Sequence, residues 1–325
     1  MGAWQSLHLF IAGGLFGSDG DRLITEVVAP ATCRLQATGA VDGFFFIRYV
    51  EKGPHVRWRI RCAPSMSKLM IEAELSRTLA GEVGTRPDLA RYEWIDYEPE
   101  VVRYGGAVGV RIAESFFERS SEAVIQVLRS RDLASPAKRR AMAMLSMLTI
   151  AAPFFAELPD LQTFLQRYSA DRMSVYGGGS DVRAELRLQV EAATERQRDR
   201  YRLAVAKSRA ALTDGEPPVA ELKALLAGAR TAKQQLTSAV RDGLIETVNG
   251  RPASFGAAAM YLLPSYLHMT ANRFGVSNAD ESFVAHGVAD ALSRCGDIES
   301  AASQIVGAAT AQECAEAHAK LHEAQ

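Results

Sequence analysis

Residues 44–62 read FFFIRYVEKGPHVRWRIRC, two apolar and basic runs joined by a Gly53-Pro54 turn. Two β-like runs around such a turn predict a hairpin. In the second run basic and apolar side chains alternate strictly, so an extended strand separates them onto opposite faces. The basic face carries His55, Arg57, Arg59 and Arg61.

This row of cations has two possible explanations. The Cα atoms of alternate residues lie about 7 Å apart, and like charges that close repel unless a carboxylate, an anionic ligand or water intervenes. Arg48 on the first run adds another cation. From the pattern alone, the surface is either a solvated strand face or an anion-binding face.

The overall composition excludes a general attraction to nucleic acid or membranes. The chain has 325 residues, 48% of them hydrophobic and 23% charged, with a net charge of -1. No signal peptide or apolar stretch of about 18 residues is present, so we expect a cytoplasmic protein. The cysteines form no CxxC pair and the histidines no HExxH motif, so we expect neither a structural metal nor a cofactor.

Periodicity predicts an α+β fold in a single domain, residues 1–325. Strand-like runs at 4–10, 44–62 and 91–97, with helix-like spacing at 21–38 and 66–81, predict a mixed β-sheet with covering helices in residues 1–104. Residues 105–325 are predicted to be mostly helical. The helical segments are expected near 107–129, 137–157, 160–175, 180–213, 218–247, 254–274 and 279–293.

The charged region from Asp181 to Asp242 is divided by Asp214-Gly215-Glu216-Pro217-Pro218. This pattern predicts a long antiparallel helical hairpin, residues 180–248, with most of its charges in solvent. Acidic residues are interleaved throughout, which disfavours a nucleic-acid arm.

Two further clusters carry possible chemistry. In YEPEVVRYGG, residues 97–106, Glu100 and Arg103 are three apart, so the carboxylate could position the guanidinium; a surface ion pair in a simple loop is the alternative. In SYLHMTANRFG, residues 265–275, Ser265, His268 and Asn272 share one helix face. Such a histidine is either a hydrogen-bonded core residue or a catalyst.

Together with Trp4-x-x-x-His8 and FFIRY plus GPHVRWRIR at 45–61, these motifs resemble the lantibiotic-dehydratase C-terminal family, in order over nearly the whole chain. The family includes elimination domains of nisin-type dehydratases and stand-alone thiopeptide-type biosynthesis proteins. This chain departs from many members at Arg119-Ser120-Ser121, where they have an Asp-Ser pair.

The resemblance implies elimination of glutamate from glutamylated Ser or Thr to give dehydroalanine or dehydrobutyrine. It assigns catalysis to Arg57, Arg59, Glu100, Arg103 and His268. We expect substrate contacts from Arg48, His55, Ser265, Tyr266, Asn272 and Arg273. The implied partners are a ribosomal precursor peptide, with its leader and core, and a separate glutamyl-tRNA-dependent glutamylating enzyme, without direct tRNA binding by this chain.

Two alternatives remain open at the level of sequence. Thiopeptide pyridine synthases of the same family join two dehydroalanines in a formal aza-cycloaddition and release the leader, and here Ser265, Tyr266 and Glu100 could be recruited for that reaction. The other alternative is a non-catalytic subunit that binds leader peptides. The complete Arg57, Arg59, Arg103 and His268 set favours elimination, because the departing carboxylate needs cations.

Overall fold

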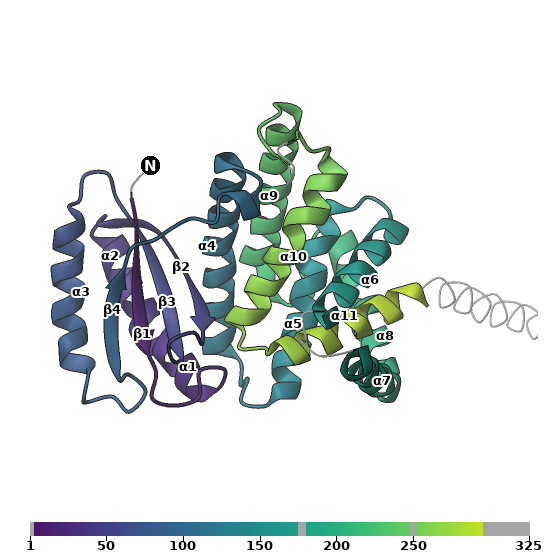
Figure 1. Ribbon diagram of the computed structural model, residues 1–325, viewed down its shortest axis with the longest axis horizontal. Helices are drawn as coiled ribbons and strands as arrows, with labels where there is room; N and C mark the ends of the chain where they lie inside the picture. The colour runs from purple at the N-terminus through teal and green to yellow at the C-terminus, as the bar shows by residue number, and fades with distance from the viewer. Residues whose placement is uncertain (1–2, 175–179, 247–250, 295–325) are drawn as a thin grey trace, which may run out of the picture.

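The computed structural model describes residues 3–174, 180–246 and 251–294, and begins with a four-stranded sheet (Figure 1). The strands are β1 (Trp4–Phe10), β2 (Val41–Tyr49), β3 (His55–Cys62) and β4 (Arg91–Ile95), in the spatial order β2-β3-β1-β4. Every pairing is antiparallel, so the mixed sheet that the sequence predicted is corrected. β1 and β2 run parallel but are separated by β3, and β3 and β4 run parallel but are separated by β1, as in a split βαβ unit.

The β2–β3 hairpin is as predicted and fixes the orientation of the basic side chains. Its turn needs positive φ at Lys52 (62°) and Gly53 (108°), a conformation that glycine adopts without strain. Arg57 lies opposite His8 on β1 and Ile47 on β2. Since partners across a ladder share a face, these three side chains emerge on the same side of the sheet.

The apolar face of the sheet is covered by helices. The helical segments are α1 (Ser18–Arg22), the π-helix η1 (Leu23–Val28), α2 (Ala29–Ala37) and α3 (Lys68–Glu82). Trp58 on β3 is fully buried, as are Ile71, Leu75 and Leu79 of α3. Trp94 of β4 ties α3 to the sheet, because its indole nitrogen donates to Ser76 Oγ over 3.1 Å. The basic face of the sheet is therefore left uncovered by these helices and is turned toward the helical part of the chain.

The rest of the described chain is helical, as predicted. Its helices are α4 (Ala107–Ser130), α5 (Pro136–Ala151), α6 (Leu158–Ser174), α7 (Ser180–Arg196), α8 (Arg198–Thr213), α9 (Lys223–Arg241), α10 (Phe255–Arg273) and α11 (Asn278–Ser293), with short 3-10 turns η2 (Val102–Tyr104), η3 (Ala152–Phe154) and η4 (Ala220–Leu222). Ser135, Ser254 and Ser277 cap α5, α10 and α11 by accepting a backbone N–H. None of the described helices is long and apolar enough to cross a membrane.

The helical hairpin predicted over 180–248 requires correction. Gln197 leaves helical geometry (φ -114°, ψ 11°) and divides the first expected helix into α7 and α8. The main partners of α8 are α5 and α11, whereas α9 lies along α4 with Leu225, Leu226 and Leu236 buried. The sequence of an amphipathic helix does not specify which apolar surface it packs on, and here α8 and α9 pack on different helices. Residues 247–250 lie outside the described chain.

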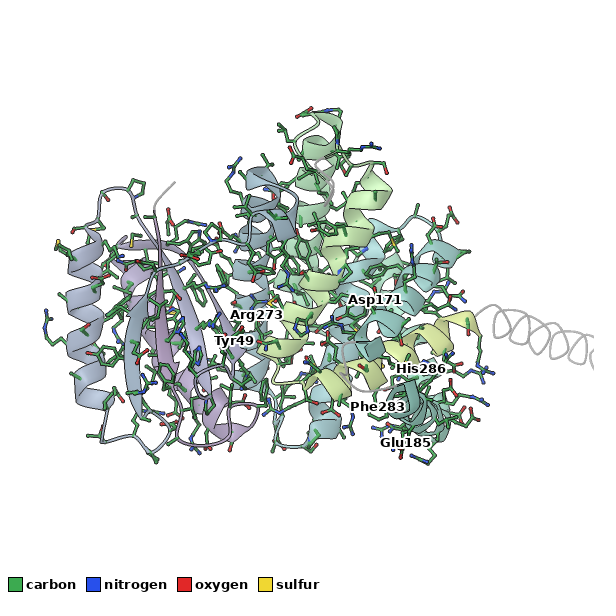
Figure 2. The ribbon with its side chains drawn as sticks, viewed as in Figure 1. Tyr49, Asp171, Glu185, Arg273, Phe283 and His286 are labelled. Atoms are coloured by element: carbon green, nitrogen blue, oxygen red, sulfur yellow. The ribbon has the colours of Figure 1, made fainter. Side chains whose placement is uncertain are left out.

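The two parts meet along β2. Figure 1 shows α4 beside β2, and Figure 2 shows Tyr49 and Arg273 near this junction, while Glu185 and His286 lie toward the far side of the helices. Arg48 is buried here, and its guanidinium donates to Asp21 and to the carbonyls of Leu15 and Arg273. The bond from Arg48 to the Arg273 carbonyl joins the two parts, and Arg139 of α5 adds an ion pair with Asp21 of α1 at 2.5 Å.

Candidate functional site

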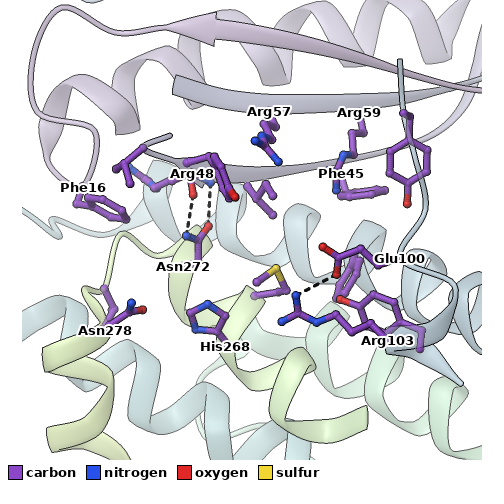
Figure 3. Close-up of a pocket in the computed structure, with 18 of the residues that line it drawn as sticks. Phe16, Phe45, Arg48, Arg57, Arg59, Glu100, Arg103, His268, Asn272 and Asn278 are labelled. Atoms are coloured by element: carbon purple, nitrogen blue, oxygen red, sulfur yellow. Dashed lines mark hydrogen bonds and ion pairs between the residues drawn. The ribbon is translucent and has the colours of Figure 1, made fainter. Parts of the chain in front are cut away.

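A cavity of about 430 Å³ lies between the basic face of the sheet, the loop after β4 and helix α10 (Figure 3). It is lined by all five residues to which the family resemblance assigns catalysis: Arg57, Arg59, Glu100, Arg103 and His268. Figure 3 shows the two strand arginines on one side and His268 with Arg103 on the other. The volume is in the range of small-molecule sites.

Arg59 is a partly buried cation without a carboxylate partner among the described residues. Its guanidinium lies over the rings of Tyr97 (4.7 Å) and Phe45 (5.2 Å), and its Nε has no hydrogen-bond partner. Burial, together with the nearby Arg57, lowers the pKa of Arg59. A partly desolvated guanidinium of this kind is suited to bind an anion.

Arg57 is held from behind by a histidine. Its Nε donates to His55 Nε2 over 3.2 Å, and its guanidinium lies 3.4 Å from the ring centroid of Tyr49. His55 Nδ1 donates to the carbonyl of Gly53 (2.8 Å), so Nε2 is free to accept. Burial lowers the pKa of His55, which favours this neutral tautomer. His55 is therefore placed behind Arg57 and does not line the cavity.

Glu100 and Arg103 form the ion pair that their spacing predicts. Arg103 Nη1 donates to Glu100 over 3.0 Å, and Arg103 Nε donates to Ser265 Oγ over 3.1 Å. Gly105, at φ 72°, ends the 3-10 turn that carries Arg103 and leads into α4. Ser265 thus contacts the site through Arg103, while both members of the ion pair are about half exposed toward the opening.

His268 is anchored by a glutamate that sequence reasoning missed. Its Nδ1 lies 2.7 Å from Oε2 of Glu281 on α11, a carboxylate that is almost fully buried. The two residues are thirteen positions apart on different helices, so no helical spacing connects them. The contact leaves Nε2 as the ring nitrogen available to the cavity.

A second missed residue supports Arg59. Glu114 of α4 accepts hydrogen bonds from the Tyr97 hydroxyl (2.8 Å) and from the Trp4 indole (2.9 Å). Burial and this carboxylate raise the pKa of Tyr97. The ring beneath Arg59 is thereby fixed in place. Trp4 and Tyr97 both belong to the motifs quoted above, and their polar groups were the only sequence signal that a buried acceptor such as Glu114 was needed.

The remaining predicted contacts are further from the cavity or fully bonded. Asn272 lines it but is bonded to the backbone of Arg48, and the Arg48 guanidinium is occupied by the contacts described above. Tyr266 is buried and stacks on Phe116 with ring centroids 4.6 Å apart. Arg273 is also buried, and its Nε donates to Ser121 Oγ over 3.1 Å.

Arg61, on the same strand face, lies outside the cavity. Its guanidinium forms ion pairs with Asp42 and Glu118, both at 2.5 Å. Strand alternation placed it beside Arg57 and Arg59. Arg61 has two close carboxylates, whereas Arg57 has only Glu51 at 4.0 Å and Arg59 has none among the described residues. This contrast makes Arg61 a natural control for the cavity arginines.

The structure contains no obvious metal site in its described part. No group of three or more His, Cys, Asp or Glu side chains is placed to hold a metal ion there. Cys33 and Cys62 are unpaired thiols, while Cys295 and Cys314 lie outside the described residues. What the cavity offers is fixed cations, a carboxylate and a histidine, a set that binds an anion and moves a proton.

Comparison with known proteins identifies the family of this chain. The family model described as "Lantibiotic biosynthesis dehydratase C-term" matches residues 4–292. The chain belongs to this family. No curated protein gives a significant sequence match.

Three solved structures share the fold. The tRNA-dependent lantibiotic dehydratase MibB from Microbispora sp. 107891 is 21% identical with a TM-score of 0.64, covering 92% of this chain and 28% of MibB. TsrL is 18% identical with a TM-score of 0.67, covering 91% of this chain and 96% of TsrL. The pyridine synthase TbtD from thiomuracin biosynthesis is 19% identical with a TM-score of 0.63, covering 91% and 99%. This chain therefore spans just over a quarter of MibB and nearly all of the other two.

Proposed function

We propose that this protein eliminates glutamate from glutamylated Ser or Thr residues of a precursor peptide, forming dehydroalanine or dehydrobutyrine. The observation that carries the proposal is Arg59, a partly buried cation without a carboxylate partner among the described residues, in the same cavity as His268. A glutamyl ester brings a carboxylate to such a cation. The modified Ser or Thr residue brings its α-proton to a base such as His268.

The reaction breaks the Cα–H bond and the Cβ–O bond of the modified residue and forms a Cα=Cβ double bond. The glutamate γ- or α-carboxyl that carried the ester leaves as a carboxylate. Negative charge develops at the peptide enolate and at this leaving group, and fixed guanidinium groups at both positions lower the barrier. Arg57 and Arg59 supply them from the sheet, Arg103 supplies a third from the loop, and Glu100 orients Arg103.

This function requires other proteins. The ester must be made by a separate glutamyl-tRNA-dependent enzyme, and the two activities would together form a split dehydratase in the cytoplasm. The substrate of this chain is then the glutamylated precursor peptide, held through its leader and core, and tRNA binding is not needed. A formal net charge near zero agrees with a protein that does not bind nucleic acid.

Pyridine synthesis on the same scaffold is the principal rival. In that reaction Ser265, Tyr266 and Glu100 would act on two dehydroalanines. The Tyr266 hydroxyl is buried and has no hydrogen-bond partner among the residues that the structure describes. Its ring is stacked on Phe116, and it does not line the cavity. A cycloaddition of neutral alkenes also gives no purpose to a partly buried arginine that has no carboxylate partner in the described part of the chain.

The test is to incubate the protein with a synthetic precursor peptide carrying one glutamylated Ser and, separately, with a bis-dehydroalanine precursor, and to follow both by mass spectrometry. Loss of one glutamic acid from the first peptide is expected. Arg59→Gln should slow this loss by about 10²-fold, the usual cost of one transition-state donor. The matched control Arg61→Gln, which removes a paired arginine from the same strand, should retain activity within about twofold.

Two outcomes would overturn the proposal. Release of the leader together with a pyridine macrocycle from the second peptide would establish the cyclase. Binding of the leader peptide without conversion of either precursor would establish a binding subunit.

A further inference from the structure

Helix α11 presents a buried carboxylate to the back of His268. Glu281 is 1% exposed, and its two oxygens have different partners: Oε2 lies 2.7 Å from His268 Nδ1, and Oε1 accepts the hydroxyl proton of Tyr168 on α6. Neither Glu281 nor Tyr168 lines the cavity. They form a support behind the histidine, on the side away from the substrate.

Arg172 of α6 completes this support. Its Nη1 lies 3.2 Å from His268 Nδ1 and 3.9 Å from Glu281 Oε2. A single ring nitrogen cannot both donate to the carboxylate and accept from the guanidinium. The shorter contact is that to Glu281, and a carboxylate facing an unprotonated nitrogen at 2.7 Å would be repulsive. Nδ1 therefore carries a proton that it donates to Glu281, while Arg172 balances the buried negative charge.

We propose that Glu281 is a positioning residue that holds His268 in the Nδ1–H tautomer, with Nε2 as the atom that moves the substrate proton. In the neutral ring Nε2 is then a lone pair beside the cavity, so His268 takes the α-proton and becomes an imidazolium that Glu281 stabilises. The catalytic part of this inference rests on the proposed elimination, whereas the tautomer follows from the geometry alone. The arrangement has the logic of a histidine oriented by a buried carboxylate.

The test measures the tautomer and the activity separately. In the wild-type protein with ¹⁵N-labelled histidine, long-range ¹H–¹⁵N correlation should show His268 protonated at Nδ1, with the signal assigned by its loss in His268→Asn. Glu281→Gln should shift the proton to Nε2 and lower kcat for glutamate elimination by about 10²-fold. KM should change by less than about threefold, because Glu281 does not touch the substrate.

Two further variants separate positioning from folding. Glu281→Asp keeps a carboxylate and should restore part of kcat, whereas Tyr168→Phe removes the other hydrogen bond to Glu281 and should keep the Nδ1–H tautomer. Unchanged thermal unfolding of Glu281→Gln would exclude simple loss of structure.

Three results would count against different parts of the proposal. An Nε2–H tautomer in the wild type at pH 7.5 would overturn the positioning role, because Arg172 would then be the donor to Nδ1. The expected tautomer without elimination of glutamate would leave the positioning geometry standing and count against the proposed function instead. Full kcat in Glu281→Gln would overturn the catalytic part of the inference.

Discussion

Asn272 of α10 pairs with the backbone of Arg48 on edge strand β2 as another strand would. Its Oδ1 accepts the Arg48 N–H and its Nδ2 donates to the Arg48 carbonyl, both over 2.8 Å (Figure 3). His268 lies one helical turn earlier on the same helix. Together with the bond from the Arg48 guanidinium to the Arg273 carbonyl, this side chain holds the arginine-bearing sheet against the helix that carries the histidine.

Asn272→Ala should lower the free energy of unfolding by about 1–3 kcal/mol, because two backbone groups lose their partners at a buried position. Urea denaturation measures this loss. Asn278→Ala is the matched control, since Asn278 also lines the cavity but has no side-chain hydrogen bond among the described contacts. Equal stability of the two variants would contradict a bridging role for Asn272.

The hydroxyl and the ring of Tyr97 should have separable effects, the hydroxyl on stability and the ring on substrate binding at Arg59. Tyr97→Phe keeps the ring beneath the guanidinium and loses the hydrogen bond to Glu114, so we expect about 1 kcal/mol less stability and little change in KM. Tyr97→Leu also loses the cation–π contact and should raise KM for the glutamylated peptide about fivefold. Steady-state kinetics of both variants check this, and a higher KM for Tyr97→Phe than for Tyr97→Leu would argue against it.

His8 should make the fold sensitive to acid. Burial, with the nearby His55 and the charge of Arg57, lowers the pKa of His8 from 6.5 to about 3. Between these values the unfolded chain binds a proton that the folded protein does not, so stability falls as the pH drops below about 6.5. The contribution of His8 approaches about 2 kcal/mol at pH 5. The free energy of unfolding of His8→Gln, measured at pH 7.5 and pH 5, should fall less than that of the wild type; an identical fall would refute the assignment.

Gly109 should be essential to the loop that carries Arg103. A Cβ at this position would lie 1.6 Å from the Tyr104 carbonyl oxygen, so Gly109→Ala must displace the turn at 102–106. We expect a loss of about 1–3 kcal/mol of stability and reduced elimination. Gly256→Ala, at an exposed helical glycine whose Cβ would meet nothing within 4 Å, is the control and should be neutral or slightly stabilising. Thermal unfolding of the pair decides the point.

Some of this protein was determined by sequence alone. The period of two in residues 55–62 put Arg57 and Arg59 on one face, because successive side chains of any strand point to opposite sides. The positions of most helices followed from periodicity, although Gln197 divides one expected helix into α7 and α8. Glu100 and Arg103 are three residues apart, and a single turn is enough to pair them.

Other features were decided only by the tertiary structure. Glu114 beneath Tyr97, Glu281 behind His268 and Asn272 on Arg48 all depend on which elements pack together, and no local spacing encodes those choices. For the same reason α8 and α9 were wrongly paired as a hairpin, since an amphipathic face does not name its partner. Local geometry chose the side chains on the basic face of the sheet. Long-range packing decided which of their charges are balanced: among the described residues Arg61 has two carboxylate partners and Arg59 has none.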